Sequence, residues 1–222
     1  ARGEGRANGG PGRAPAPLQV AVSPGPVPAD LGTYENGMIF GCKKETSGEN
    51  ERRGLLGLPI NHLKTVERIQ PGKTALFIFH YNSRELHALY APTSPGGLNI
   101  EPDAYVEIAK RLSHKHPAGP PAHPDGGSPF PAQVRYRPVF QFTPLQEWQW
   151  QHVVEYQKYT HHFRFWLEKA QVRQLLELFR VNHGKPQAPR PVRREARPEG
   201  EEKERGRGAE ARNGGGGGGG NG

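Results

Sequence analysis

The aromatic residues of this 222-residue chain all lie in its middle part. The 9 Phe, 7 Tyr and 3 Trp fall between Tyr34 and Phe179, and neither end of the chain contains one. A packed core needs large apolar side chains, and segments that lack them stay disordered. We therefore expect residues 34–181 to form the folded part, and residues 1–33 and 182–222 to be disordered flanks. A chain of about 150 residues is long enough to fold alone as one domain.

The two flanks share a composition that is typical of flexible chain. Both are rich in Gly and Pro, and the carboxyl flank alternates Arg with Glu over residues 190–212 before a glycine run at 214–220. The chain carries 30 Lys and Arg against 22 Asp and Glu, a net charge of +8, and half of that excess belongs to the flanks. The net charge is therefore weak evidence for a nucleic-acid ligand of the folded part.

Cysteine content and hydropathy exclude two classes of protein. The chain has 1 Cys, so it contains no internal disulfide and no zinc site built from four thiolates. No run of 18 or more apolar residues occurs, so we expect no membrane span. We expect an intracellular protein of the cytoplasm or the nucleus.

Hydrophobic patterns in the middle part alternate between strand and helix periods. The clearest signal is a hairpin over residues 74–90, whose arms are apolar enough to be covered on both faces. Residues 43–54 indicate a loop or a poorly formed helix, and residues 113–129, rich in Pro and Gly, indicate an exposed low-complexity insertion. The other elements are strands over 37–42, 133–142 and 163–167, and helices over 63–69, 102–112, 143–156 and 172–179. This order predicts a single α+β domain with a mixed or largely antiparallel sheet flanked by helices.

The segment Thr143–Gln146 predicts the start of a helix. It combines an N-cap residue, a proline at the first helical position and a capping-box partner. On such a helix Leu145 and Trp148 face the core. Trp150 lies about 200° further round the helix and emerges on the opposite side.

An aromatic side chain beside basic residues is the strongest candidate for a binding surface. An exposed Trp150 next to Arg135 and Arg137 of the preceding strand could stack on a base or clamp a peptide. The alternative, that Trp150 packs under the last helix or a loop, stays open. Arg84 and His87 in the hairpin are further candidates for partner or ligand contact, although His87 also suits a hydrogen-bonded position in the core or at its rim.

Metal and catalytic chemistry are weakly supported. His114, His116 and His123 lie in the insertion without an acidic or thiolate partner at ligand spacing, and the adjacent His161-His162 point apart on a strand, so we expect no metal and no cofactor. Cys42 at a strand end is expected to be a small buried hydrophobe and not a nucleophile. Gly96-Gly97 lacks the Lys and Ser/Thr of a phosphate-binding loop, which favours a turn.

Four short motifs occur in a fixed order along the folded part. They read Leu56-Gly57-Leu58-Pro59, Leu76-Phe77-Ile78, Pro131-Ala132-Gln133-Val134 and Pro144-Leu145-Gln146-Glu147. This order resembles the plant DCD (development and cell death) domain, whose pattern runs F-G-L-P, L-F-L, P-A-Q-V and P-L-x-E. The resemblance covers residues 34–181. Leu56, Ile78 and Ala88 depart from the family pattern by apolar or small exchanges, which should cost about 1–2 kcal/mol of packing and not the fold.

The resemblance implies a regulatory module of plants and green algae, found in proteins tied to stress responses, development, hormone signalling and programmed cell death. It implies no enzyme chemistry. We expect its motif residues to be structural, with Gln133 and Glu147 acting as buried polar anchors that tie strand to helix. The order of strand, helix, Pro-Gly turn and hairpin also suggests, by analogy of fold, a small PUA-like or YTH-like barrel.

Two functions from different classes remain. The first is a non-enzymatic protein-interaction module in stress or cell-death signalling. The second is an RNA-binding module that reads single-stranded bases in an aromatic pocket, with phosphates held by a basic rim at Arg135 and Arg137.

Overall fold

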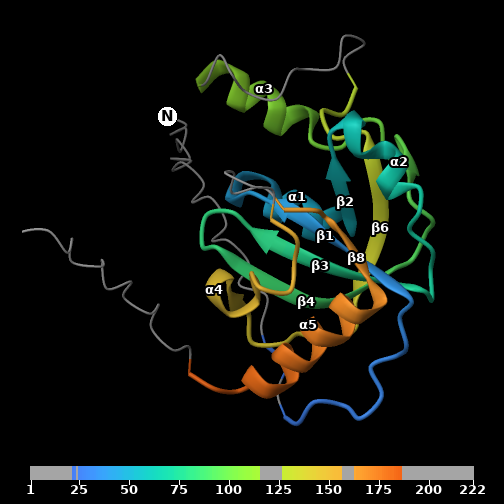
Figure 1. The fold of residues 1–222 in the computed structure, drawn as a ribbon. Helices are drawn as coiled ribbons and strands as arrows, with labels where there is room; N and C mark the ends of the chain where they lie inside the picture. The colour runs from blue at the N-terminus through green and yellow to red at the C-terminus, as the bar shows by residue number, and fades with distance from the viewer. Residues whose placement is uncertain (1–21, 24, 116–126, 157–162, 187–222) are drawn as a thin grey trace, which may run out of the picture. The chain divides into compact units, whose positions relative to one another are not determined.

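Strands and short helices alternate along the chain (Figure 1). The computed structural model describes residues 22–23, 25–115, 127–156 and 163–186, all of which belong to one compact unit. In chain order the elements are β1 (Asn36–Cys42), α1 (Lys44–Arg53), β2 (Leu55–Leu58), η1 (Ile60–His62), α2 (Leu63–Val66), β3 (Thr74–His80), β4 (Glu85–Pro92), β5 (Gly97–Leu98), α3 (Val106–Lys115), β6 (Ala132–Pro138), β7 (Leu145–Gln146), α4 (Glu147–Trp150), β8 (Trp166–Glu168) and α5 (Lys169–Asn182). This mixture confirms the α+β class expected from the sequence.

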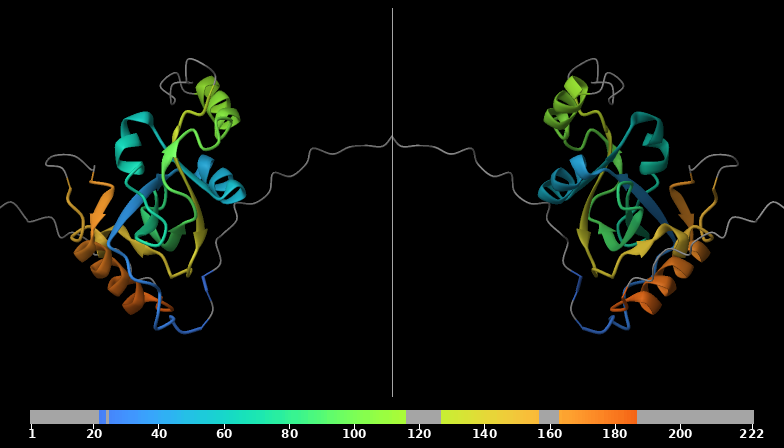
Figure 2. Two further views of the ribbon diagram at one scale, coloured as in Figure 1. Left: turned by 90° about the vertical axis from the view of Figure 1, so that its right-hand side faces the viewer. Right: turned by 90° about the vertical axis from the view of Figure 1, so that its left-hand side faces the viewer.

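The strands of the described chain form one mixed sheet. Its hydrogen-bonded order is β2-β6-β4-β3-β1-β8, with β5 added beside β6 and β7 beside β4. Strands β1 and β3 run parallel, in a register that places Cys42 beside His80, and the other neighbours run antiparallel. The sheet curls strongly, in the manner of a half-barrel (Figure 2). The mixed sheet predicted from the sequence is therefore confirmed.

Alternating side chains of β3 fill two cores on opposite faces of the sheet. Phe77 and Phe79 point into the first core, where Phe179 of α5 stacks on Phe77 at a ring-centroid distance of 6.2 Å. Helix α5 lies against this face of the sheet (Figure 1). Leu76 and Ile78 point into the second core on the other face. All of these side chains are buried. The hairpin is thus covered on both faces, as its apolar sequence predicts.

Helix α1 is regular, where the polar sequence indicated a loop or a poorly formed helix. An ion pair between Glu49 and Arg53 (2.6 Å) supports it from within, and Gly54 ends it in the left-handed conformation at φ 58°. A third contact comes from the β3–β4 turn, because the Lys44 N–H donates to Asn82 Oδ1 at 2.9 Å. This contact joins distant parts of the chain, so the local pattern could not reveal it.

The helix predicted from Thr143 begins later than expected, and the prediction of its start was wrong. Strand β7 occupies residues 145–146 and pairs with the start of β4, and α4 is a single turn. Sheet pairing therefore outweighs the local capping signal. Thr143 contributes elsewhere, because its Oγ1 accepts a hydrogen bond from the Gly184 N–H at 3.0 Å.

Helix α3 also begins later than predicted. Residues 102–105 form a turn in which Tyr105 has a φ of 65°, and the helix starts at Val106. The exposed insertion expected over 113–129 is shorter at both ends. Residues 113–115 continue α3, and Ser128 is buried and donates its N–H to the Pro102 carbonyl at 2.7 Å. The remainder of the insertion, 116–126, lies outside the described residues.

The packed part extends beyond both expected boundaries. Leu31 is buried in the first core, and the Ser23 N–H donates to the Gln141 carbonyl at 2.8 Å. At the other end, His183 Nδ1 accepts a hydrogen bond from the Thr143 N–H at 3.2 Å. A backbone hydrogen bond, the His183 side chain and one leucine thus hold segments that contain no Phe, Tyr or Trp. The rest of the flanks expected to be disordered, residues 1–21, 24 and 187–222, lies outside the described residues.

Candidate binding site

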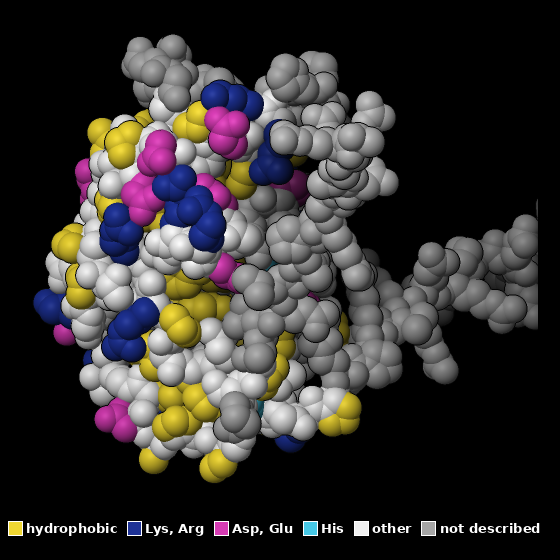
Figure 3. Space-filling model, turned by 180° about the vertical axis from the view of Figure 1, so that it is seen from behind, with side chains coloured by type: hydrophobic (Ala, Val, Ile, Leu, Met, Phe, Trp, Pro, Cys, Tyr) yellow, Lys and Arg dark blue, Asp and Glu magenta, His cyan; other side chains and the backbone are white. Residues whose placement is uncertain are grey.

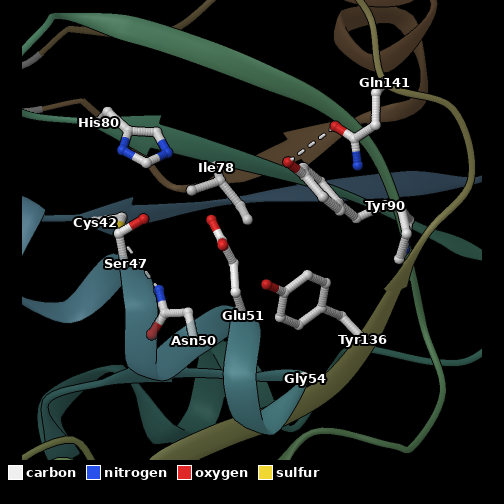
Figure 4. Close-up of a pocket in the computed structure, with 11 residues that line it drawn as sticks. Cys42, Ser47, Asn50, Glu51, Gly54, Ile78, His80, Tyr90, Tyr136 and Gln141 are labelled. Atoms are coloured by element: carbon white, nitrogen blue, oxygen red, sulfur yellow. Dashed lines mark hydrogen bonds between the residues drawn. The ribbon is translucent and has the colours of Figure 1, made fainter. Parts of the chain in front are cut away.

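A cavity of about 340 Å³ opens between α1 and the strands β1, β3, β4 and β6 (Figure 4). This volume lies at the lower end of the range for small-ligand pockets, roughly 300–1,000 Å³. Helix α1 contributes polar groups to the lining, and β4 and β6 contribute tyrosines. The cavity is therefore of a size for one side chain or one small group.

Two tyrosine rings form the aromatic wall of the cavity. Tyr90 of β4 and Tyr136 of β6 meet edge to face, with ring centroids 5.4 Å apart. The Tyr90 hydroxyl donates to Gln141 Oε1 at 3.4 Å. Burial raises the pKa of both phenols, so both stay neutral. The wall thus offers aromatic surface together with neutral hydroxyl groups.

Glu51 supplies the charged group of the lining. Its side chain leaves α1 toward the space between Ile78 and Tyr136 (Figure 4). Burial raises the pKa of the Glu51 carboxyl, while the Ser47 hydroxyl and the charge of His87 oppose that shift. Among the residues that line the cavity in the described chain, none is Lys or Arg.

Cys42 and His80 lie side by side at one end of the cavity. The Cys42 thiol is buried and accepts a hydrogen bond from Asn50 Nδ2 at 3.3 Å. Burial raises its pKa to about 11, so the thiol stays protonated at neutral pH. Burial, helped by the charge of His87, lowers the pKa of His80 to about 4. The pair therefore presents neutral groups and not an activated nucleophile with its base.

The floor of the cavity is fixed by a buried hydrogen-bond cluster behind α1. Asn50 is 6% exposed. The Tyr105 hydroxyl lies 2.8 Å from Asn50 Oδ1 and 2.9 Å from the Leu55 carbonyl oxygen. With Nδ2 on Cys42 and Oδ1 facing Tyr105, the Asn50 amide is held from both sides. This cluster positions α1, and therefore Glu51, against the sheet.

Trp150, the centre of the predicted binding surface, lies in the first core instead. It is 0% exposed, and its ring meets those of Phe79 and Phe163 at centroid distances of 5.3 Å each. The sequence left open whether Trp150 is exposed or packed, and the structure shows it packed. The prediction assumed a long helix from Thr143 with Trp148 facing the core. Helix α4 is instead one turn long, and Trp150 faces the core.

Two of the three predicted basic contacts are engaged within the chain. Arg135 pairs with Glu101 at 2.8 Å, and Arg84 forms a two-point ion pair with Glu147, in which Arg84 Nε lies 2.9 Å from Oε2. Arg137 is exposed. The structure therefore does not join these side chains and Trp150 into one surface.

His87 lies at the rim of the sheet with other polar side chains. Its ring centroid is 4.4 Å from that of His80, and its Nε2 is 3.6 Å from Glu85 Oε2. It is partly buried and does not line the cavity in the described chain. Its position matches the rim location weighed from the sequence.

The polar residues of the family motifs are tied into the protein. Gln133 is 0% exposed and links β6 to the Glu101 backbone. Glu147 is partly buried, binds Arg84 and accepts a hydrogen bond from the Tyr156 hydroxyl at 2.8 Å. Both residues connect segments far apart in the sequence, although Gln133 binds the loop residue Glu101 and Glu147 binds Arg84 of the β3–β4 turn, where we expected ties between a strand and a helix.

The apolar motif residues build the strands. The buried ones are Leu56, Leu58, Leu76, Phe77, Ile78, Pro131, Ala132, Val134 and Leu145. Pro144 is partly buried, and Pro59 is exposed before η1. Gly57 has a packing reason, because a Cβ there would lie 2.9 Å from the Phe130 carbonyl oxygen. Close packing also requires glycine at position 96, because a Cβ there would overlap the Val66 carbonyl oxygen.

None of the residues that the sequence marked as candidates for partner or ligand contact lines the cavity in the described chain. No sequence signal pointed to Glu51, because residues 43–54 were expected to form a loop or a poorly formed helix. No group of three His, Cys, Asp or Glu residues that could hold a metal occurs in the described chain. His116, His123, His161 and His162 lie outside the described residues, and of His114 only the backbone is described. None of the helices within the described ranges is long and apolar enough to cross a membrane.

A curled mixed sheet with helices on its faces and a side-chain-sized cavity under α1 defines a small α+β domain. Residues 36–179 match the family model of the "Development and cell death domain", which is more than half of the chain. The chain therefore belongs to the development and cell death (DCD) domain family, and the resemblance found in its motifs is confirmed.

Plant proteins are among the similar sequences. The chain is 37% identical over 111 residues to the DCD domain-containing protein NRP-B of Glycine max, 34% over 148 residues to NRP of Arabidopsis thaliana, and 35% over 111 residues to the B2 protein of Daucus carota. These matches cover 50%, 64% and 50% of this chain, and 29%, 36% and 46% of those proteins. The matched region thus spans less than half the length of these relatives.

Among solved structures, the chain is similar to YTH domains at low sequence identity and with TM-scores below 0.5. The Pho92 YTH domain, solved in complex with m6A, is 10% identical with a TM-score of 0.46, over 74% of this chain and 93% of that chain. The Mmi1 YTH domain, solved in complex with RNA, is 11% identical with a TM-score of 0.42 over the same shares.

Proposed function

We propose that this domain is a non-enzymatic protein-interaction module and that the cavity under α1 is its recognition site. Membership of the DCD family supports a role in plant development and programmed cell death, and we extend the proposal to stress and hormone signalling in the cytoplasm or nucleus. One observation carries the proposal: an open cavity with an aromatic wall whose charged lining group in the described chain is a carboxylate, Glu51.

The chemistry of the cavity supports a binding role over catalysis. The Cys42 thiol stays protonated at neutral pH, and His80 stays neutral next to it. A nucleophilic site needs the opposite, namely a thiolate or a base in hydrogen-bond contact with its nucleophile. Neutral donors and acceptors beside aromatic rings suit reversible recognition.

The distribution of charge favours a protein partner over a nucleic acid. Basic and acidic side chains lie next to each other on the face shown in Figure 3, and Arg135 and Arg84 are each paired with a glutamate. Phosphate groups are held by free Lys and Arg side chains. The paired arginines supply little of that attraction.

Filling the cavity tests this proposal. Ser47 lines the cavity from α1, so Ser47→Leu places a larger side chain inside it at no cost in helix propensity. Gly48→Leu adds the same side chain one residue further along α1, where a Cβ meets no atom within 4 Å. The full chain and both variants are used to capture proteins from plant extract treated with nuclease. We expect at least one partner that is retained by the wild type and Gly48→Leu and lost by Ser47→Leu.

Two results would overturn the proposal. Equal capture of the partner by Ser47→Leu and the wild type would show that the cavity takes no part in recognition. Recovery of RNA from untreated extract, with binding that falls steeply with salt and is lost in Ser47→Leu, would replace the protein partner by RNA.

A further inference from the structure

Glu51 differs from three other partly buried glutamates of the domain. Glu49, Glu101 and Glu147 are each paired with an arginine of the chain. The described chain gives Glu51 no such partner, although its side chain points into the cavity (Figure 4). A carboxylate withdrawn from water without a cation is unfavourable, so a ligand that brings a positive charge gains there.

The groups around Glu51 specify more than a charge. The Glu51 carboxylate and the Ser47 and Tyr136 hydroxyls can all accept hydrogen bonds within one cavity. A guanidinium carries five N–H donors in a plane and binds a carboxylate at two points. An ammonium offers a compact point charge and matches such a spread of acceptors less well.

The aromatic wall suits the same group. A planar guanidinium stacks on tyrosine faces, and the aliphatic stem of an arginine packs against apolar surface. Tyr90 and Tyr136 provide the rings, and Ile78 provides apolar surface opposite Glu51. A phosphate-bearing ligand would meet the Glu51 carboxylate with no lining Lys or Arg in the described chain to balance it.

We infer that the cavity binds an arginine side chain of the protein partner, with its guanidinium on Glu51 and its stem against Tyr90 and Tyr136. This inference rests on the proposed function and names the chemistry that the partner must present. The ligand is an arginine in an accessible segment of another protein, inserted between α1 and the sheet.

The test uses a peptide with one arginine in a Gly/Ser context and the full chain labelled with ¹⁵N. Two further peptides carry citrulline, which has the shape of arginine without its charge, and lysine. We expect the arginine peptide to shift the amide signals of Asn50, Glu51 and Gly54 in a saturable way. The citrulline peptide should bind at least about tenfold more weakly, because it lacks the charge-assisted pair.

Protein variants supply the second measurement. Glu51→Gln keeps the shape of the side chain and should lower the affinity for the arginine peptide by about tenfold or more. Glu45→Gln removes an equal charge from an exposed position on the same helix and should leave affinity unchanged. Saturable binding that is equal for citrulline, or unaffected by Glu51→Gln, would overturn the inference, as would the absence of shifts with the arginine peptide.

The two proposals fail in distinguishable ways. If Ser47→Leu abolishes capture of the plant partner while Glu51→Gln leaves that capture intact, the cavity is the recognition site and its ligand is not an arginine. If Ser47→Leu has no effect on capture, the proposed function fails, whatever the peptides do.

Discussion

Two polar side chains of this domain, Gln133 and Glu51, lie close to the same sheet in contrasting surroundings. Gln133 on β6 is fully buried, and its amide is used on both sides: Oε1 accepts from the Glu101 N–H at 2.7 Å, and Nε2 donates to the Glu101 carbonyl at 3.1 Å. Its Nε2 also lies 3.3 Å from Ser128 Oγ. Glu51 on α1 is partly buried and faces an open cavity without a cation of the described chain.

The contrast separates a structural polar group from a recognition group. A buried amide bonded to its own chain stabilises the fold, and its loss leaves several groups unsatisfied. A carboxylate in an open cavity keeps its bonding capacity for a ligand. Changes at Gln133 should therefore appear in stability and changes at Glu51 in binding.

The largest effect is expected for Gln133→Leu. The substitution leaves the Glu101 N–H, the Glu101 carbonyl and the Ser128 hydroxyl without this partner, so the free energy of unfolding should fall by about 2–4 kcal/mol. Urea denaturation followed by circular dichroism measures it. A loss below about 0.5 kcal/mol would place Gln133 among ordinary surface positions.

Tyr105→Phe should have an intermediate effect on the free energy of unfolding, because it removes a single hydroxyl group from the cluster behind α1. Removal of the hydroxyl leaves the Asn50 Oδ1 and the Leu55 carbonyl without their contact, which should cost about 1–2 kcal/mol. Tyr81→Phe, at a residue that is 38% exposed, is the control and should change the free energy of unfolding by less than about 0.5 kcal/mol. Equal effects of the two substitutions would show that the cluster behind α1 contributes little.

Acid should weaken the binding of the arginine peptide, because protonation removes the Glu51 charge. Burial raises the pKa of the Glu51 carboxyl, so binding is present above that pKa and is lost as the pH falls through it, at a higher pH than for an ordinary glutamate. Of the other groups at the cavity, the Cys42 thiol and the two tyrosines stay neutral in this range.

His80, with a pKa of about 4, gains a positive charge only at lower pH and then opposes the cation further. His87, at the rim, influences the Glu51 carboxyl through its own charge, and Glu85 lies beside it. Titrations between pH 7.5 and 4.5 should show a loss of affinity of about fivefold or more. The affinity of the Glu51→Gln variant should depend less on pH. An identical pH dependence would show that protonation of Glu51 does not cause the loss of affinity.

The smallest effect is expected for Glu51→Gln on stability. A carboxyl whose pKa is raised in the folded state is less favourable when ionised there than in the unfolded chain, so removing its charge should not destabilise the fold at neutral pH. We expect a change within about 0.5 kcal/mol, with any shift toward higher stability. A loss above about 1 kcal/mol in the same urea experiment would make Glu51 a structural residue like Gln133.

The comparison also shows how far the sequence predicts this domain. The hairpin and the last helix were predicted because their apolar residues repeat at strand and helix periods, and Gln133 was predicted as a buried anchor from its place in a motif. Helix α1 and strand β7 were not predicted, because each depends on a partner far along the chain, Asn82 for the first and the start of β4 for the second. Local patterns do not contain such partners.

The same reason explains the errors at the candidate site. Trp150 was considered as an exposed contact because its neighbours in sequence suggested a longer helix, whereas its neighbours in space are Phe79 and Phe163. Glu51 gave no signal because an acidic residue in a polar segment is ordinary. It becomes notable only once α1 is placed over the tyrosines of β4 and β6.

The hydrogen bond from Lys44 to Asn82 has a consequence for the order in which the domain assembles. A polar helix of ten residues does not persist alone in water, and the partner for the first amide of α1 exists only after the β3–β4 turn has formed. We therefore expect the hairpin to form before α1 docks. In the native ensemble, α1 should accordingly be among the segments that open at low free-energy cost, with amide protons that exchange early. A ligand that bridges Glu51 and the tyrosines would hold that segment closed.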